Sequence, residues 1–146
     1  MARETPIDRV RRDKAEGKSA STQAGEFVRE EIDRIRKGYH GARSPEQAIA
    51  IGLSMARRAG VKLPPPPAGK TSPETRHKAE LDLEKGRRHN KPSPTRSRAR
   101  IKALQHEPTS AVSHKALSEH AKKAARRRGH ADLSRAARKA ARTRQR

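Results

Sequence analysis

Apolar residues recur at helical spacing between residues 22 and 37 and predict the first helix of the chain. Acidic side chains are concentrated early in this segment and basic side chains late, before Gly38, which is the order that the helix dipole favours. The pattern therefore indicates an amphipathic helix with one face to bury. Its apolar stripe consists of Ala24, Phe27, Val28, Ile32 and Ile35.

A second helix is predicted to begin at residues 44–47, which have the sequence Ser-Pro-Glu-Gln. Serine is a favoured N-cap and proline suits the first helical position. A glutamine three residues after the cap completes a capping box. The helix body, residues 48–59, has one apolar face that contains Ile49, Leu53 and Ala56.

The end of this second helix is equally well marked. Gly60 fits the left-handed position after a helix, and Val61 follows where a Schellman motif makes its hydrophobic contact. The prolines at 64–67 then form a stiff spacer. Residues 21–63 are therefore expected to form a helical hairpin. Its predicted core is Phe27, Val28, Ile32, Ile35, Ile49, Leu53 and Ala56.

Helical signals continue beyond the prolines, but large apolar residues become rare. A short helix is expected to stop near Gly86, where a basic linker begins, and a further short helix is expected between residues 94 and 104. Residues 116–126 are echoed by residues 132–142, with Gly129 between the two copies. This repeat predicts two short helices separated by a break. The apolar positions of the helix before Gly86 are Ala79, Leu81 and Leu83.

Composition limits how much of the chain can fold. Only 30% of the residues are apolar and the net charge is +21, so little apolar surface offsets the conformational entropy of folding, and charge repulsion opposes compaction. We therefore expect an all-α protein in four parts. These are a disordered charged N-terminus (1–20), the helical hairpin (21–63), a proline-rich spacer with a short helix (64–92), and a basic arm (93–146) that is largely disordered or conditionally helical.

The basic arm is the main functional signal in the sequence. Residues 92–146 hold 16 basic and 3 acidic side chains, which is more than half of the excess positive charge. Such an excess attracts polyanions, and lysine and arginine neutralise the phosphates of nucleic acids. The candidate phosphate-binding residues are Arg96, Arg98, Arg100, Lys102, Lys122, Lys123, Arg126, Arg127, Arg128, Arg135, Arg138, Lys139, Arg142, Arg144 and Arg146.

The kind of nucleic acid follows from what the arm lacks. One side of each repeat copy is mostly alanine, with Leu117 and Leu133 as its larger residues, so it forms a helix readily but cannot build a core. Helix formation and binding are therefore expected to be coupled. The aromatic residues, Phe27 and Tyr39, both belong to the hairpin, which leaves the arm without a platform for unstacked bases. We expect non-specific, electrostatically driven DNA binding, with duplex DNA favoured over RNA.

No pattern of a catalytic or metal site is present. The sequence has no P-loop, nucleophile elbow or dinucleotide fingerprint, and we expect neither enzymatic activity nor a cofactor. Cysteine is absent, and the seven histidines do not pair at a metal-binding spacing. The carboxylates of Glu30, Glu31 and Asp33 have arginine neighbours and are interpreted as pairs on a helix surface.

A membrane role is not expected either. The longest uncharged apolar-rich stretch, residues 48–56, is far shorter than the ~20 residues that span a bilayer. The charged N-terminus lacks the apolar region of a secretory signal. We therefore expect a cytoplasmic protein of the bacterial nucleoid.

Two alternative functions remain open. Basic segments without aromatics also bind ribosomal RNA, so the chain could be an RNA- or ribosome-associated protein. The hairpin could instead act as a protein-interaction adaptor, because its apolar face is larger than two short helices need. That face would then bind another protein or a second copy of the chain.

Residues 42–64, Ala-Arg-Ser-Pro-Glu-Gln-Ala-Ile-Ala-Ile-Gly-Leu-Ser-Met-Ala-Arg-Arg-Ala-Gly-Val-Lys-Leu-Pro, resemble a family of small basic bacterial proteins of unknown function. With the preceding Gln-Ala-Gly-Glu-Phe-Val-Arg-Glu-Glu segment, the resemblance covers about residues 21–66 and implies a bacterial origin but no activity. The arm is similar in composition to the tails of bacterial histone H1-like proteins. Residues 93–96, Ser-Pro-Thr-Arg, resemble a linker-histone repeat, although an N-cap before a first-turn proline is the favoured interpretation.

Overall fold

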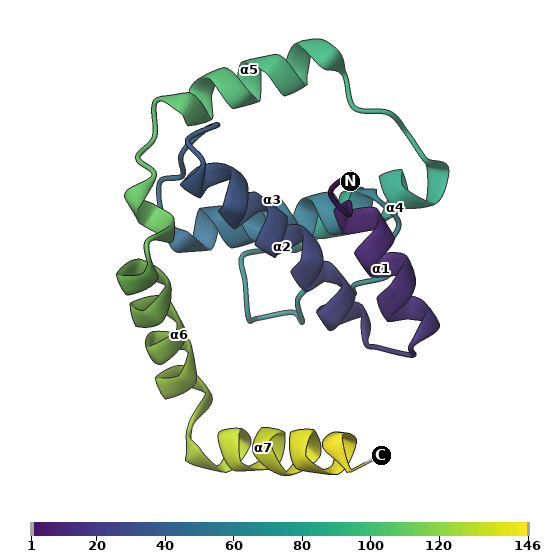
Figure 1. The fold of residues 1–146 in the computed structure, drawn as a ribbon, viewed down its shortest axis with the longest axis vertical. Coiled ribbons are helices and arrows are strands. Elements are labelled where there is room, and N and C mark those ends of the chain that lie inside the picture. Colours follow the sequence, from purple (N-terminus) through teal and green to yellow (C-terminus); the bar gives the residue numbers. More distant parts are fainter. Residues whose placement is uncertain (1, 146) are drawn as a thin grey trace.

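The computed structural model describes residues 2–145, and the regular elements in that range are helices joined by loops, which confirms the expected all-α class (Figure 1). Each of the first six α-helices begins at a serine or threonine whose side chain accepts a hydrogen bond from the backbone amide three residues later. The α-helices are α1 (Pro6–Ala15), α2 (Ala20–Arg36), α3 (Pro45–Arg58), α4 (Pro73–Arg88), α5 (Pro94–Gln105), α6 (His114–Arg128) and α7 (His130–Arg144), and a short 3-10 helix, η1 (Ser110–Val112), precedes α6.

The predicted hairpin is present as the closely packed pair α2 and α3, which lies at the centre of the molecule (Figure 1). The two helices approach most closely where Gly52 of α3 faces the backbone of Val28 in α2. A Cβ atom on Gly52 would lie 2.6 Å from the Cα atom of Val28. The absence of a side chain at Gly52 therefore permits this helix contact.

Both ends of α3 follow the predicted cap chemistry, with one difference. Ser44 accepts from the amide of Gln47, but the Gln47 side chain accepts from the amide of Arg43 in place of Ser44, so the capping box is displaced by one residue. At the other end, the Val61 amide donates to Ala56 over 3.0 Å and the Gly60 amide donates to Arg57. These two bonds make a Schellman motif.

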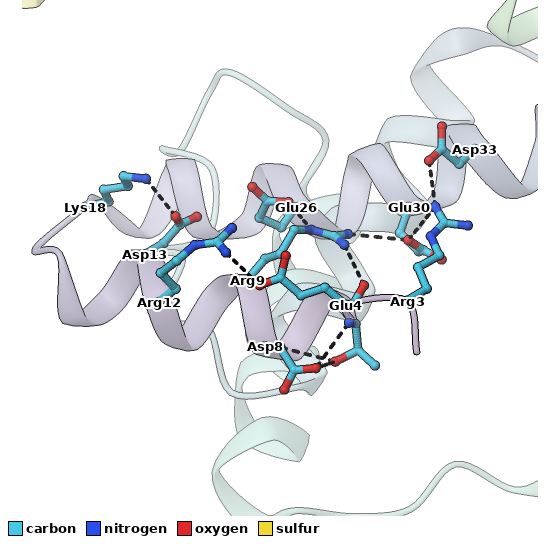
Figure 2. Close-up of polar contacts among 11 residues, drawn as sticks. Arg3, Glu4, Asp8, Arg9, Arg12, Asp13, Lys18, Glu26, Glu30 and Asp33 are labelled. Carbon is cyan, nitrogen blue, oxygen red and sulfur yellow. Dashed lines mark hydrogen bonds and ion pairs between the residues drawn. The ribbon is translucent and has the colours of Figure 1, made fainter. Parts of the chain in front are cut away.

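The N-terminal segment differs from the disordered 1–20 region expected from the sequence. Residues 6–15 form α1, which packs on α2 and is held there by ion pairs (Figure 2). Arg9 is half-buried and contacts both Glu26 and Glu30 of α2, while Arg3 lies 3.0 Å from Asp33. The charges that suggested disorder pair across the two helices, and this pairing removes the self-repulsion.

The core consists of two apolar clusters, one at each end of the hairpin. Of the predicted core, Phe27, Ile35 and Ala56 are buried, whereas four residues are only partly buried: Val28, Ile32, Ile49 and Leu53. Ile51 is buried in place of Ile49, because α3 is covered by α2 on one side and by α4 on another. One cluster contains Ala24, Phe27, Ala56 and Val61, and the other contains Ile35, Ala42, Ala48, Ala111 and Val112.

Helix α4 continues past the point where the sequence predicted its end. Gly86 is buried inside the helix, and a Cβ atom there would lie 2.1 Å from the carbonyl oxygen of Arg57. The helix ends at His89, which adopts a left-handed conformation (φ 52°). Gly86 therefore allows α4 to approach the end of α3, and the linker between α4 and α5 is shortened to residues 89–93.

The basic arm is mostly helical, and its residues 104–112 dock on the folded core, which corrects the largely disordered arm expected from the sequence. The Gly41 amide donates to Leu104 over 2.9 Å, and the Ala42 amide donates to Pro108 over 3.0 Å. Val112 is fully buried, and its carbonyl oxygen accepts from the Arg36 side chain. The prediction missed this docking because a single valine among polar residues gives no periodic signal.

Candidate nucleic-acid interface

The predicted phosphate-binding residues lie on three consecutive helices at the edge of the molecule (Figure 1). Helix α5 passes over the hairpin, α6 begins beside the start of α3 and runs away from it, and α7 turns aside beyond Gly129, which has a φ of 80°. The two helices and the break predicted from the repeat are therefore confirmed. Arg146 lies outside the described residues.

Helix α6 has one side against the body of the molecule, which consists of α1 to α4, and one side in solvent. Leu117 packs against the cluster that contains Ile35 and Val112, and His120 Nδ1 lies 3.1 Å from Glu46 Oε1 at the start of α3. Lys122 and Arg126 are four residues apart and lie about half a turn away from this contact face. Helix α6 is therefore fixed to the body by its Leu117 side and presents cations on the other.

Helix α7 shows the clearest separation of cations from apolar residues. Leu133 and the alanines at 137 and 140 share one face. The opposite face carries Arg135, Arg138, Lys139 and Arg142, and Asp132 at its edge pairs with Arg135. At 1.5 Å per residue, this stripe extends over about 10 Å of helix. Four cations in one short row make α7 the strongest candidate for a phosphate-contacting surface.

Helix α5 carries its cations differently. Arg96 and Arg100 lie on one side of the helix and Arg98 and Lys102 on the opposite side, and all four are exposed. The predicted residues therefore do not merge into one patch. They form one stripe on α7, a second on α6, and two pairs on opposite sides of α5.

Charge pairing differs sharply between the body and the arm. In residues 2–91 many basic side chains contact carboxylates, as Arg9, Lys18 and Arg58 do. In residues 93–145, the Lys and Arg side chains that form ion pairs are Arg128 and Arg135, which share Asp132. The hydrogen bond from Arg128 lowers the pKa of Asp132 and keeps it charged. The other arm cations are exposed and available to a polyanion.

One buried polar pair was not anticipated from the sequence. Glu31 was interpreted as a surface residue, but its carboxylate is buried and lies 2.8 Å from His40 Nε2. The other ring nitrogen of His40 is 2.9 Å from the carbonyl oxygen of Gly41, which has no hydrogen to offer, so Nδ1 must be the donor. The pair fixes the loop after α2, beside the place where the arm docks.

No helix among residues 2–145 is long and apolar enough to cross a membrane. Over the same residues, no group of three or more histidine, aspartate or glutamate side chains is placed to hold a metal ion.

Comparison with known proteins shows that part of this all-α chain is similar to an uncharacterised family. Residues 11–66 match the model of a family of unknown function (DUF6496). The matched segment runs from α1 to the proline spacer and includes the hairpin, but stops before the basic arm. It agrees with the resemblance to a family of unknown function and carries no activity. No curated protein and no solved structure shows significant similarity to the chain.

Proposed function

We propose that this protein binds DNA non-specifically through the basic helices of residues 93–146, as a nucleoid-associated, histone H1-like protein and not as an enzyme. The body, α1 to α4, anchors these helices. Phosphates of a duplex backbone neutralise the cations of the arm, and release of counterions supplies most of the binding free energy.

The observation that carries the proposal is the exposed stripe on α7. Arg135, Arg138, Lys139 and Arg142 lie on one face, opposite alanines, and three of them make no ion pair with the carboxylates of residues 2–145. A solvated surface needs no such segregation, whereas in the body basic side chains such as Arg9 and Arg58 pair with carboxylates. A row of like charges on a short helix is unfavourable until a polyanion neutralises it.

The structure gives less support to the alternative that the hairpin is a protein-interaction adaptor. It rested on an apolar hairpin face that two helices could not cover. In the structure α1, α4 and the segment around η1 cover that face within the same chain. Binding to RNA remains an alternative, because phosphate contacts alone do not distinguish RNA from DNA.

The test is the affinity of the full-length protein for duplex DNA of two unrelated sequences and for structured RNA over a salt series. Six to ten phosphate contacts predict a loss of roughly 10³–10⁵ in affinity between 50 and 200 mM salt. Similar affinity for both duplexes, with no preference for RNA, is the expected result.

A matched pair of variants locates the contacts. Replacing Arg138, Lys139 and Arg142 by alanine removes three cations from α7 and should lower the salt slope by up to about 2.7, since each phosphate contact contributes about 0.9. Replacing the exposed Lys70, Lys78 and Lys85 removes the same charge outside the arm and should change the slope little. Equal effects of both triples would contradict an arm-specific site. A clear preference for RNA would favour the ribosomal alternative, and weak, salt-independent binding would favour the adaptor.

A further inference from the structure

Tyr39 is held in an unusual position at the end of α2. Its amide donates to the Arg34 carbonyl over 3.1 Å and the Gly38 amide donates to Ile35, so the two close a Schellman motif in which Gly38 has a φ of 83°. The residue in Tyr39's place commonly packs on the last turn of the helix. Tyr39 instead remains 65% exposed. The next residue, His40, is buried against Glu31, so a fixed backbone presents an exposed aromatic ring.

The ring lines a cleft between the body and the basic arm. The cleft has a volume of about 510 Å³ and is bounded on one side by the end of α2 with Tyr39 and His40. Ile101 and Gln105 of α5 form the other side, and Arg3 also lines the cleft. Helix α5 is held there by the bond from the Gly41 amide to the Leu104 carbonyl. The fold therefore brings an aromatic ring of the hairpin beside the basic helix, although 62 residues separate Tyr39 from Ile101 in the sequence.

The charges around the cleft favour an anion at its rim. Glu30 and Asp33 belong to the lining, but Arg3 lies within 3.6 Å of both carboxylates (Figure 2). Arg34 and Lys37 also line the cleft. Arg98 precedes Ile101 by three residues and Gln105 by seven, and so shares their face of α5.

We propose that this cleft binds an unpaired nucleobase of the nucleic acid that the arm holds. The base would stack on Tyr39 with Ile101 on its other side, Gln105 would offer a hydrogen bond to the base edge, and Lys37 and Arg98 would contact the flanking phosphates. An aromatic platform beside a basic track is the combination by which proteins hold single strands. The inference rests on the proposed nucleic-acid binding and adds single-stranded segments to its ligands.

The chain supplies its own reporter for this site. Tyr39 is the one tyrosine and the sequence contains no tryptophan, so the tyrosine fluorescence of the full-length protein reports on this ring alone. Titration with a thymidine oligonucleotide is expected to quench it saturably, because the base stacks on the ring. A duplex of the same length should bind to the arm without this quenching.

Variants separate stacking from charge. Tyr39→Ala should weaken binding of the thymidine oligonucleotide roughly 5- to 150-fold, as expected for loss of one stacked base, and leave duplex affinity unchanged. Tyr39→Phe keeps the aromatic face and should retain affinity for the oligonucleotide. The matched control is Leu81→Ala, which removes another exposed large apolar side chain, on α4, and should affect neither ligand. Unchanged helical circular dichroism would verify that each variant is folded.

Different results would contradict duplex binding by the arm and base binding by the cleft. Salt-dependent duplex binding without quenching by the oligonucleotide, or with a Tyr39→Ala variant that keeps its single-strand affinity, would overturn the base-binding cleft and leave arm binding intact. Equal weakening of both ligands by Tyr39→Ala would also overturn it, because the ring would then not select unpaired bases. Absence of binding to either ligand would overturn the proposed function and this inference together.

Discussion

Val112 of the basic arm and Ile35 of α2 are both fully buried and belong to the same apolar cluster. They are the two largest side chains in the chain's described part that are wholly inaccessible to solvent. The residue that completes this cluster therefore comes from the segment that the sequence assigned to a free arm. Ala42 and Ala48 offer little apolar area of their own, so Val112 supplies much of the cluster's contact surface.

Replacing Val112 by alanine is expected to lower the free energy of unfolding by about 1–3 kcal/mol, through lost burial and the cavity left behind. Urea denaturation would measure this free energy, with the fluorescence of Tyr39, which lies near the docking site, as the signal. Leu133→Ala, in the exposed part of α7, is the control and should change the value little. Equal effects of the two substitutions would mean that the arm does not dock as described.

Two glycines inside helices should respond oppositely to alanine. At Gly52 a Cβ atom meets the backbone of Val28, which cannot move aside, so Gly52→Ala is expected to destabilise the protein by about 1–3 kcal/mol. Gly25 has nothing within 4 Å of a Cβ position. Gly25→Ala should therefore stabilise the protein by about 0.5–1 kcal/mol through helix propensity. Thermal unfolding of both variants tests the close contact between α2 and α3.

Glu46 at the start of α3 should titrate below its ordinary value of 4.5. A hydrogen bond from its own backbone amide lowers the pKa first, and the hydrogen bond with His120 lowers it further. A carboxylate with a lowered pKa stabilises the folded state above its unfolded pKa, and this contribution is lost as the pH falls through the lowered value. Nuclear magnetic resonance of the Glu46 carboxyl group would give the midpoint. His120→Ala should raise the midpoint towards 4.5 without restoring it fully.

Arg57 is expected to hold the chain that leaves α3. Its guanidinium donates to the carbonyl oxygens of Leu63 and Pro64 over 3.2 and 3.1 Å. Burial lowers its pKa, while the charge of Asp82 opposes that effect. Arg57→Ala should cost about 1.5–3 kcal/mol in the free energy of unfolding, because the substitution removes hydrogen bonds from a charged group.

Two further variants make the Arg57 prediction specific. Arg57→Lys should recover only part of the loss, since an ammonium group cannot reproduce the planar fork of donors. Arg87→Ala, at a side chain that is 78% exposed, should fall within about 0.5 kcal/mol of the unchanged protein. A similar loss at Arg87 would argue against a special role for Arg57.

Features that depend on neighbouring residues could be predicted from the sequence. The Ser44 cap, the Schellman motif at Gly60, the helix after Ser93 and the break at Gly129 are local, and each is found where the residues indicate. The start of helix α1 also has a local cap signal, although residues 1–20 are predicted from the sequence to be disordered. Thr5 and Asp8 cap each other's backbone amides, and a proline occupies the first turn.

Features that depend on distant residues could not be predicted. Gly86 looked like a helix end because its contact with Arg57 is visible only after α4 folds onto α3. Glu31 looked exposed because its partner, His40, is brought back by the turn after α2. For the candidate site, the cations of α6 and α7 were identified from charge alone. The position of Tyr39 beside α5 needed the fold, because the hairpin and the arm are remote in sequence.

The docking of the arm through Leu104, Pro108 and Val112 couples folding to ligand binding. If the body unfolds, α6 loses its contact at Glu46 and the arm loses its orientation. A polyanion that prefers the oriented arm must then also stabilise the body, by up to about 2.7 kcal/mol when its free concentration is a hundred times Kd, the full value requiring no affinity for the unfolded chain. The melting temperature of the body, whose core includes Phe27, should therefore rise as ligand fills the arm helices, although Phe27 does not contact those helices.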